Sequence, residues 1–124
     1  MEFEEITRVS KLKINYYKFG RVKIDSENFN NDVIILPDRV VPNWWRRNGH
    51  EVHIEDIGEI IKAAPDVLIV GTGYYGMLRV LGDTSKRLAD IGCEVIKMKT
   101  QEACKLYNEL AKTKRIAATL HLSC

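Results

Sequence analysis

Residues 71–76 are the stretch whose types and spacing come closest to a known binding motif. They read GTGYYG, which fits the pattern G-x-G-x-x-G directly after an apolar run. In a dinucleotide fingerprint, such glycines let the backbone approach a pyrophosphate, and amides at a helix N-terminus bind the anion. The candidate ligand-binding residues of this loop are Gly71, Thr72, Gly73, Tyr74, Tyr75 and Gly76.

The surroundings of this loop argue against a dinucleotide. A fingerprint loop opens directly into a helix, whereas the next helix is expected only at Asp83. The strand that follows ends in Lys97-Met98-Lys99, with no acidic residue for a ribose, and 124 residues are too few for two mononucleotide-binding halves and a substrate domain. We therefore predict no cofactor. Two interpretations of the loop stay open: a tight glycine turn, or amides that hold an anionic small molecule.

A second unusual stretch, which follows Pro42, consists of Trp44, Trp45, Arg46 and Arg47. Two indoles beside two guanidiniums can stack on a ligand, hold an anion or anchor a protein contact. Neighbouring side chains of an extended segment point to opposite sides, so we expect at least one tryptophan to be buried. If strands at residues 33–36 and 66–70 are adjacent and parallel, this stretch shares a sheet edge with the glycine loop, near Tyr74 and Tyr75.

Cysteines and histidines predict no metal site. Cys93, Cys104 and Cys124 have no C-x-x-C spacing, so we expect a reducing, cytoplasmic setting rather than a disulfide framework. Cys93 and Cys104 fall in a strand and on a helix and are expected to be inert, whereas Cys124 is expected to be exposed. A structural zinc site needs four ligands, and His50 and His53 point to opposite faces of an extended segment. No catalytic set can be assembled.

The first predicted strands follow from the alternation of apolar and polar residues. Period-two hydropathy predicts a strand over residues 12–19, with Ile14 and Tyr16 on the same inner face. A second short strand over residues 22–24 completes a hairpin. Residues 25–32 are rich in turn-forming side chains and are expected to be a loop.

From residue 33 onward, apolar strands alternate with amphipathic helices. The expected strands cover residues 33–36, 51–54, 66–70, 93–98 and 116–122. The expected helices begin at the N-cap residues Asp56, Asp83 and Thr100, and Gly92 ends the second of them. This alternation predicts an α/β fold with a central mixed, mostly parallel sheet, helices on it, and the N-terminal hairpin as an additional layer.

The composition restricts the class of protein. The chain has 124 residues, 45% of them hydrophobic and 29% charged, so we expect residues 1–124 to form a single domain. A net charge of +2 gives no basic stripe for nucleic acid. No apolar run approaches the roughly 20 residues of a membrane span, and the first residues show no secretory signal. We therefore expect a cytoplasmic protein that binds neither nucleic acid nor membrane.

Motifs along the chain resemble a known family. They are GTG at residues 71–73, Val95-Ile96-Lys97-Met98-Lys99-Thr100, Ala103, Tyr107-Asn108-Glu109-Leu110, Arg115-Ile116-Ala117-Ala118 and Pro42-Asn43-Trp44. From about Leu12 to Leu122 the chain is similar to small single-domain proteins of unknown function, a family that includes the adipogenesis-associated domain protein and a mitochondrial assembly factor for respiratory complex I. The resemblance implies a three-layer α/β fold, action through protein contacts, and neither a catalytic set nor dinucleotide binding.

These observations predict a non-enzymatic binding or assembly module. Its surface is expected to combine residues 44–47 with the loop at 71–76, and its partner to be a second copy in a homodimer or another protein. The alternative is a small enzyme or binder that holds an anionic metabolite on the amides of residues 71–76. A flat apolar surface favours the first hypothesis, and a closed pocket with convergent amides favours the second.

Overall fold

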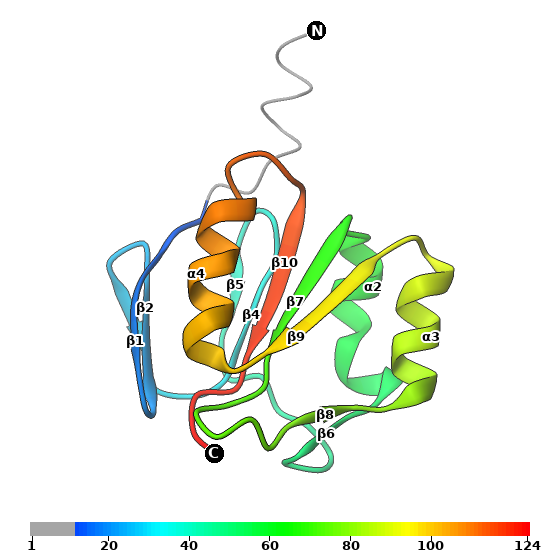
Figure 1. The fold of residues 1–124 in the computed structure, drawn as a ribbon, viewed down its shortest axis with the longest axis horizontal. Helices are drawn as coiled ribbons and strands as arrows, with labels where there is room; N and C mark the ends of the chain where they lie inside the picture. The colour runs from blue at the N-terminus through cyan, green and yellow to red at the C-terminus, as the bar shows by residue number, and fades with distance from the viewer. Residues whose placement is uncertain (1–11) are drawn as a thin grey trace, which may run out of the picture.

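A five-stranded sheet forms the centre of the computed structural model, which describes residues 12–124 (Figure 1). Its strand order is β5-β4-β10-β7-β9. The strands are β4 (Val33–Ile35), β5 (Val40–Val41), β7 (Val67–Gly71), β9 (Glu94–Met98) and β10 (Ile116–Leu120). Strands β9, β7 and β10 are parallel, whereas β4 runs antiparallel to β10 and β5 antiparallel to β4, so the sheet is mixed.

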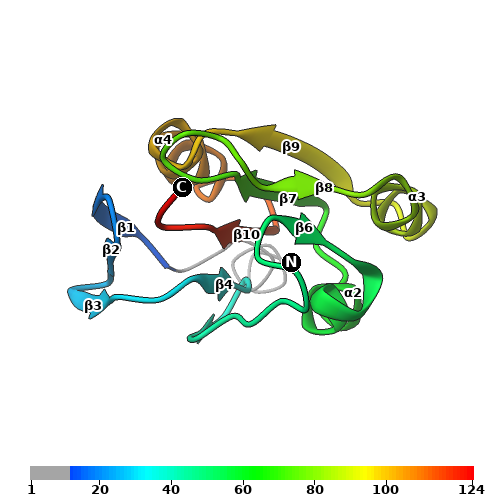
Figure 2. The ribbon, with the colours of Figure 1, turned by 90° about the horizontal axis from the view of Figure 1, so that it is seen from below.

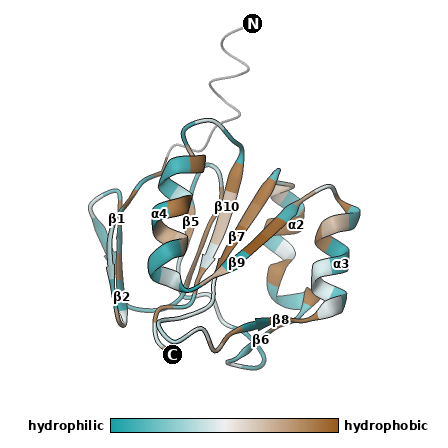
Figure 3. Cartoon of the chain, in the orientation of Figure 1, coloured by the Kyte–Doolittle hydropathy of each residue, from teal (hydrophilic) through white to brown (hydrophobic). Residues whose placement is uncertain are grey.

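The central strands contribute to two cores because successive side chains of a strand point to opposite faces. Val67 and Ile69 enter one core, and Leu68 and Val70 enter the other. Figure 3 shows β7 in the brown of hydrophobic residues along most of its length. The prediction that residues 66–70 form a strand buried on both faces is confirmed, apart from its first residue.

Each face of the sheet has its own cover. One carries helix α4 (Thr100–Leu110) and an antiparallel sheet of β1 (Ile14–Lys18), β2 (Arg21–Ile24) and β3 (Glu27–Phe29). The other carries α2 (Gly58–Ala63), α3 (Gly82–Asp90) and a 3-10 turn, η1 (Ile54–Ile57) (Figure 2). The side chain of Asn108 joins α4 to β1, because it accepts the N–H of Ile14 at 2.9 Å and donates to the Ile14 carbonyl at 2.7 Å. The predicted α/β fold with an N-terminal hairpin is confirmed.

Two further strands, β6 (Glu51–Val52) and β8 (Arg79–Val80), pair in parallel outside the central sheet. Strand β6 precedes α2 in the chain, and β8 follows β7. None of the helices within residues 12–124 has the length and apolar character that a bilayer crossing requires.

The N-terminal hairpin departs from simple alternation. A β-bulge between Ile14 and Tyr16 shifts the register, so that Ile14 is buried while Tyr16 is 39% exposed. Tyr17 turns inward instead, and its hydroxyl donates to the Leu122 carbonyl at 2.8 Å. The prediction that Ile14 and Tyr16 share a face is therefore wrong. Residues 25–32 are also not wholly a loop, because β3 pairs with β2 within them.

The helix ends confirm the predicted end of α3 and correct the predicted N-caps. Gly92 ends α3 with φ +79°, as expected of a glycine beyond a helix C-terminus. The N-cap of α3 is Leu81, and Asp83 lies in the first turn. Asp56 lies inside η1, where its carboxylate accepts the N–H of His53 at 2.8 Å. Asp56 and Asp83 are thus not N-caps, because Asp56 lies in a 3-10 turn that precedes α2, and α3 already begins at Gly82.

Candidate functional site

Three loops meet at one edge of the central sheet. Strands β7 and β10 both end there, which brings residues 72–78 and 121–124 together. Strand β4 is antiparallel to β10 and therefore begins at this edge and leads away from it. Strand β5 is antiparallel to β4 and leads back, so residues 42–50 lie at the same edge. Figure 2 views the molecule from this side. The condition considered from the sequence, that strands at 33–36 and 66–70 are adjacent and parallel, is not met, because β10 separates them and β4 is antiparallel; the shared edge arises from β5 instead.

The tryptophan–arginine stretch alternates between inside and outside. Trp44 is 7% exposed, and its Nε1–H donates to the carbonyl of Asp56 at 2.9 Å, whereas Trp45 is 78% exposed. Arg46 is buried with its guanidinium 4.5 Å from the centre of the Trp44 ring, and Arg47 is exposed. The expectation of at least one buried tryptophan is confirmed.

Arg46 belongs to a buried polar cluster. Its Nη1 lies 2.9 Å from Oδ2 of Asp32, and the same oxygen lies 2.7 Å from Nδ1 of His121. The other oxygen of Asp32 accepts the backbone N–H of Leu122 at 2.8 Å. Arg46 Nη2 donates to the Gly49 carbonyl at 2.8 Å. The cluster therefore fixes three segments that are distant in sequence.

The protonation pattern of the Asp32–His121 pair follows from these contacts. Burial acts to raise the pKa of Asp32, but hydrogen bonds from His121 and the Leu122 N–H, with electrostatic attraction to His121 and Arg46, lower it overall. An ionised carboxylate only accepts, so Nδ1 of His121 carries a proton and donates it to Asp32. The 3.3 Å contact between Nδ1 and Arg46 Nη2 is longer and does not alter this assignment. In the neutral form of the ring the lone pair lies on Nε2, which is buried and has no hydrogen-bond partner among residues 12–124.

The glycine loop packs against this cluster. A Cβ on Gly73 would lie 2.6 Å from the carbonyl oxygen of Cys124 and 2.8 Å from Cδ2 of His121, and Gly73 has φ +110°. Thr100 is not the N-cap of α4, because Lys99 occupies that position. The Thr100 hydroxyl instead accepts the Gly73 N–H at 2.8 Å and donates to the His121 carbonyl at 2.7 Å. This close approach supports the tight-turn interpretation of the loop.

Several amides of the loop are already used within the chain. The N–H groups of Thr72, Tyr74, Gly76 and Met77 donate to the carbonyls of Met98, Ser123, Gly73 and Cys124, respectively. An anion bound here would have to displace these bonds. A hollow of about 320 Å³ lies beside Asp32 and Trp45, but neither Arg46 nor residues 71–76 line it.

Exposed aromatic rings gather where the loop meets the β1–β2 turn. Phe19 is 52% exposed, Tyr74 44% and Tyr75 63%. The ring centres of Tyr74 and Tyr75 lie 5.0 Å apart, and Phe19 lies 5.7 Å from Tyr74 and 6.4 Å from Tyr75. We call these three residues the aromatic patch. Both tyrosines were predicted as site residues but Phe19 was not, because the packing of the hairpin brings it to them; the Gly20 N–H and the Tyr17 hydroxyl both donate to the Leu122 carbonyl.

Residues 14–121 match the sequence pattern of a family described as "Protein of unknown function (DUF498/DUF598)". The chain belongs to this family. The crystal structure of the conserved hypothetical protein PH1505 from Pyrococcus horikoshii OT3 is similar to it, with 38% sequence identity and a TM-score of 0.78. That similarity covers 90% of this chain and 99% of the other.

Two more distant structures share the fold of this DUF498/DUF598 chain. An outer membrane protein from Bartonella henselae is 22% identical with a TM-score of 0.80, over 94% of this chain and 99% of that one. A Bordetella pertussis protein described as a Mth938-like domain is 21% identical with a TM-score of 0.69, over 89% of this chain and 85% of that one. The resemblance seen in the sequence is thus confirmed as membership of a family of small domains of unknown function.

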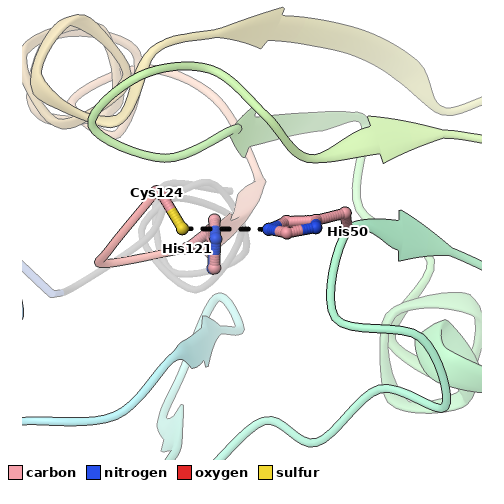
Figure 4. Close-up of side chains that lie close together, drawn as sticks. All are labelled: His50, His121 and Cys124. Carbon is pink, nitrogen blue, oxygen red and sulfur yellow. Dashed lines mark hydrogen bonds between the residues drawn. The ribbon is translucent and has the colours of Figure 1, made fainter.

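One group of side chains was not predicted from the sequence. His50, His121 and Cys124 lie together beyond the end of β10 (Figure 4), with Cys124 Sγ 3.8 Å from His50 Nε2. One donor atom from each lies within 4.8 Å of the others. His121 and Cys124 form an H-x-x-C pair, which the lack of C-x-x-C spacing does not exclude. Nothing in the sequence signals that His50 joins them.

The remaining cysteines lie where the sequence places them. Cys93 and Cys104 are buried, and Cys124 is exposed. Burial raises the pKa of Cys104 to about 12. Burial, with the nearby charges of Asp66 and Glu94, raises the pKa of Cys93 to about 11. Both thiols therefore stay protonated at neutral pH, which agrees with the inert role expected of them.

Proposed function

We propose that this protein is a binding module that acts through protein contacts, and that the aromatic patch of Phe19, Tyr74 and Tyr75 is its contact surface. The observation that carries this proposal is the exposure of three neighbouring rings at one edge of the fold. Tyrosine and phenylalanine bury large areas with few rotatable bonds and are enriched in the centres of protein interfaces. Trp45, 78% exposed on the same edge, adds to the apolar surface available there.

The charges around the patch favour a partner with acidic side chains. Lys18 and Arg21 flank Phe19 at the β1–β2 turn, and both are exposed. Lys99, on the other side, is exposed, and its side chain passes close to Gly76. Among the described residues, the ion pairs of the chain do not involve these three cations. A second copy would bring like charges together, so we propose a different protein that carries apolar and acidic side chains.

The geometry gives less support to the alternative of an anionic metabolite on residues 71–76. Several amides of that loop donate within the chain, and Arg46 is paired with Asp32 and with the Gly49 carbonyl. Arg47 is exposed but pairs with Glu55 at 3.4 Å on the surface. An anion would have to replace bonds that the loop already makes.

Selection from a displayed library of random peptides, with the full chain as bait, tests the proposal. We expect selected peptides to combine aromatic or aliphatic residues with Asp and Glu. Their affinity should fall about tenfold in Phe19→Ala and in Tyr75→Ala, as for truncated hot-spot residues, and should fall with added salt. Tyr16→Ala is the matched control, because Tyr16 is exposed on the same hairpin but outside the patch.

Two results would overturn this assignment. One is the selection of peptides that bind the Phe19→Ala and Tyr75→Ala variants as tightly as the original chain. The other is a concentration-dependent dimer in sedimentation that Tyr75→Ala dissolves, since the patch would then serve a second copy of the chain.

Three finer predictions accompany this proposal. We propose that residues 1–124 act as one domain, although residues 1–11 lie outside the described part of the chain. We also propose a cytoplasmic location, which three unpaired thiols support. The similarity to the adipogenesis-associated protein and to the complex I assembly factor stays a prediction, and a role in protein assembly fits the contact surface proposed above.

A further inference from the structure

We propose that His50, His121 and Cys124 bind one Zn²⁺ or a similar divalent transition-metal ion, through two imidazole nitrogens and one thiolate. This inference does not rest on the proposed function. Zinc forms bonds of about 2.0–2.1 Å to nitrogen and about 2.3 Å to sulfur, so tetrahedral ligand atoms lie about 3.5 Å apart. Cys124 Sγ and His50 Nε2 are 3.8 Å apart, and the donor atoms of all three residues fit within 4.8 Å of one another (Figure 4).

The buried ring of His121 provides the independent observation. Its Nδ1–H donates to Asp32, and its Nε2 is buried with no hydrogen-bond partner in the described part of the chain. A buried nitrogen of this kind loses its bond to water on folding and gains nothing in return. Metal-binding histidines regularly donate their second N–H to a carboxylate, which fixes the ring and leaves the other nitrogen free to coordinate. A metal ion at Nε2 would satisfy this atom.

His50 is held at the site by its backbone. Its N–H donates to the side chain of Asn48 at 2.9 Å, and its carbonyl accepts the N–H of Arg79 at 2.9 Å. The Gly49 carbonyl, one residue earlier, accepts from Arg46, which also pairs with Asp32. The carboxylate that orients His121 is therefore linked to the loop that presents His50.

Cys124 is brought to the site by the glycine loop. The N–H of Met77 donates to the Cys124 carbonyl at 3.1 Å, and the N–H of Tyr74 donates to the Ser123 carbonyl at 2.6 Å. Gly73 leaves room for this segment, because a side chain there would strike both Cys124 and His121. The motif that resembles a dinucleotide fingerprint would then serve to position metal ligands.

The donor set determines the class of metal. Two imidazoles and a thiolate suit zinc and copper rather than magnesium or calcium, which prefer oxygen ligands. Binding converts the Cys124 thiol to a thiolate and releases its proton to solvent. Three protein ligands leave a fourth position of a tetrahedral ion unfilled. His50 and Cys124 are exposed, so water or a ligand atom can reach that position.

Titration of the reduced full chain with Co²⁺ alone tests the site. Cobalt reports tetrahedral coordination through its visible bands and thiolate coordination through a near-ultraviolet charge-transfer band. We expect one Co²⁺ per chain, displacement by Zn²⁺, and a rise in melting temperature with Zn²⁺ that follows its concentration. Affinity should fall by about tenfold or more in His50→Ala and in Cys124→Ser, in line with the loss caused by disturbing a metal site.

His53→Ala is the matched control. The chain has three histidines, and His53 is the one outside the cluster, where it pairs with Glu51 at 3.1 Å. His50 and Cys124 are exposed, so their variants should fold, which circular dichroism checks; the buried His121 is left intact. The proposal is overturned if the original chain shows no thiolate-to-cobalt band at equimolar metal. It is also overturned if Cys124→Ser keeps full affinity or if His53→Ala loses as much affinity as His50→Ala.

Discussion

Asp32 and His121 are 89 residues apart in the sequence, yet Oδ2 of one lies 2.7 Å from Nδ1 of the other. Asp32 directly precedes β4 and His121 directly follows β10, and these strands are antiparallel neighbours. Their pairing therefore brings the two side chains to the same edge of the sheet. The orientation of the His121 ring, and with it the direction of its unpaired nitrogen, depends on this contact.

The first prediction concerns the buried ion pair of Asp32 and Arg46. Asp32→Asn should lower the free energy of unfolding by about 3–5 kcal/mol, because it leaves the Arg46 guanidinium buried without its counter-charge. Urea unfolding measures the change. Asp38→Asn is the control, since Asp38 pairs with Arg39 at the surface and should matter by about 0.5 kcal/mol or less. Equal losses in both variants would contradict the buried-pair argument.

The second prediction separates two reasons for glycine in the loop. Gly73 has a positive φ, and the Cβ of Gly73→Ala would also strike Cys124. Gly20 has a positive φ too, but no atom lies within 4 Å of the Cβ that Gly20→Ala adds. We expect Gly20→Ala to cost about 1 kcal/mol and Gly73→Ala about 3 kcal/mol or more. Thermal unfolding compares the two variants with Gly49→Ala, which has neither constraint. Similar melting temperatures for all three would refute the close approach.

The third prediction concerns the two tryptophans. Trp44→Ala should destabilise the fold by about 3–5 kcal/mol, because it removes a buried indole and its bond to Asp56. Trp45→Ala should change stability by about 0.5 kcal/mol or less. Fluorescence of Trp44→Phe should report a solvent-exposed indole, and that of Trp45→Phe a buried one. The reverse assignment of the spectra would show that the inside and outside positions are exchanged.

The fourth prediction is a loss of stability at alkaline pH. The pKa of Cys104 is raised by burial to about 12, so the folded chain keeps a proton that the unfolded chain releases near pH 9. The unfolded state then binds fewer protons, and the free energy of unfolding falls as the pH rises from about 9 towards 12. Urea unfolding between pH 8 and about 11 measures the slope. Cys104→Ala should reduce the slope and leave the part that comes from Cys93, whose pKa is also raised, and an unchanged slope would exclude Cys104 as a source.

The fifth prediction is selective thiol reactivity. Cys124 is exposed and should react with a thiol reagent in the folded chain at neutral pH. Cys93 and Cys104 are buried with raised pKa values, and should react only after the chain unfolds. Absorbance of the group released from the reagent should report one reacted thiol per chain in buffer and three in denaturant. Rapid release of more than one equivalent from the folded chain would contradict the burial of these thiols.

The fold was largely predictable because its main signals are local. Aliphatic residues in consecutive positions, as in Val67 to Val70, indicate a strand covered on both faces whichever neighbours it has. Gly92 marks a helix end by its own conformational freedom. The bulge next to Tyr16 was not predictable, because it depends on how β1 and β2 pair. The two-residue strand β5 was missed for the same reason, since its pairing with β4 defines it.

For the site, the residue types and their spacing indicated the stretch at residues 44–47 and the loop at residues 71–76, and the burial of at least one tryptophan, but not the group of His50, His121 and Cys124. Which of these side chains meet depends on the packed fold. His50 reaches Cys124, and Asp32 reaches His121, through the order and direction of β4, β10 and β7. Hydropathy along the chain indicates which side of a strand is buried. It carries no information about which strand lies beside it, because any apolar strand can pair with any other and bury its side chains equally well.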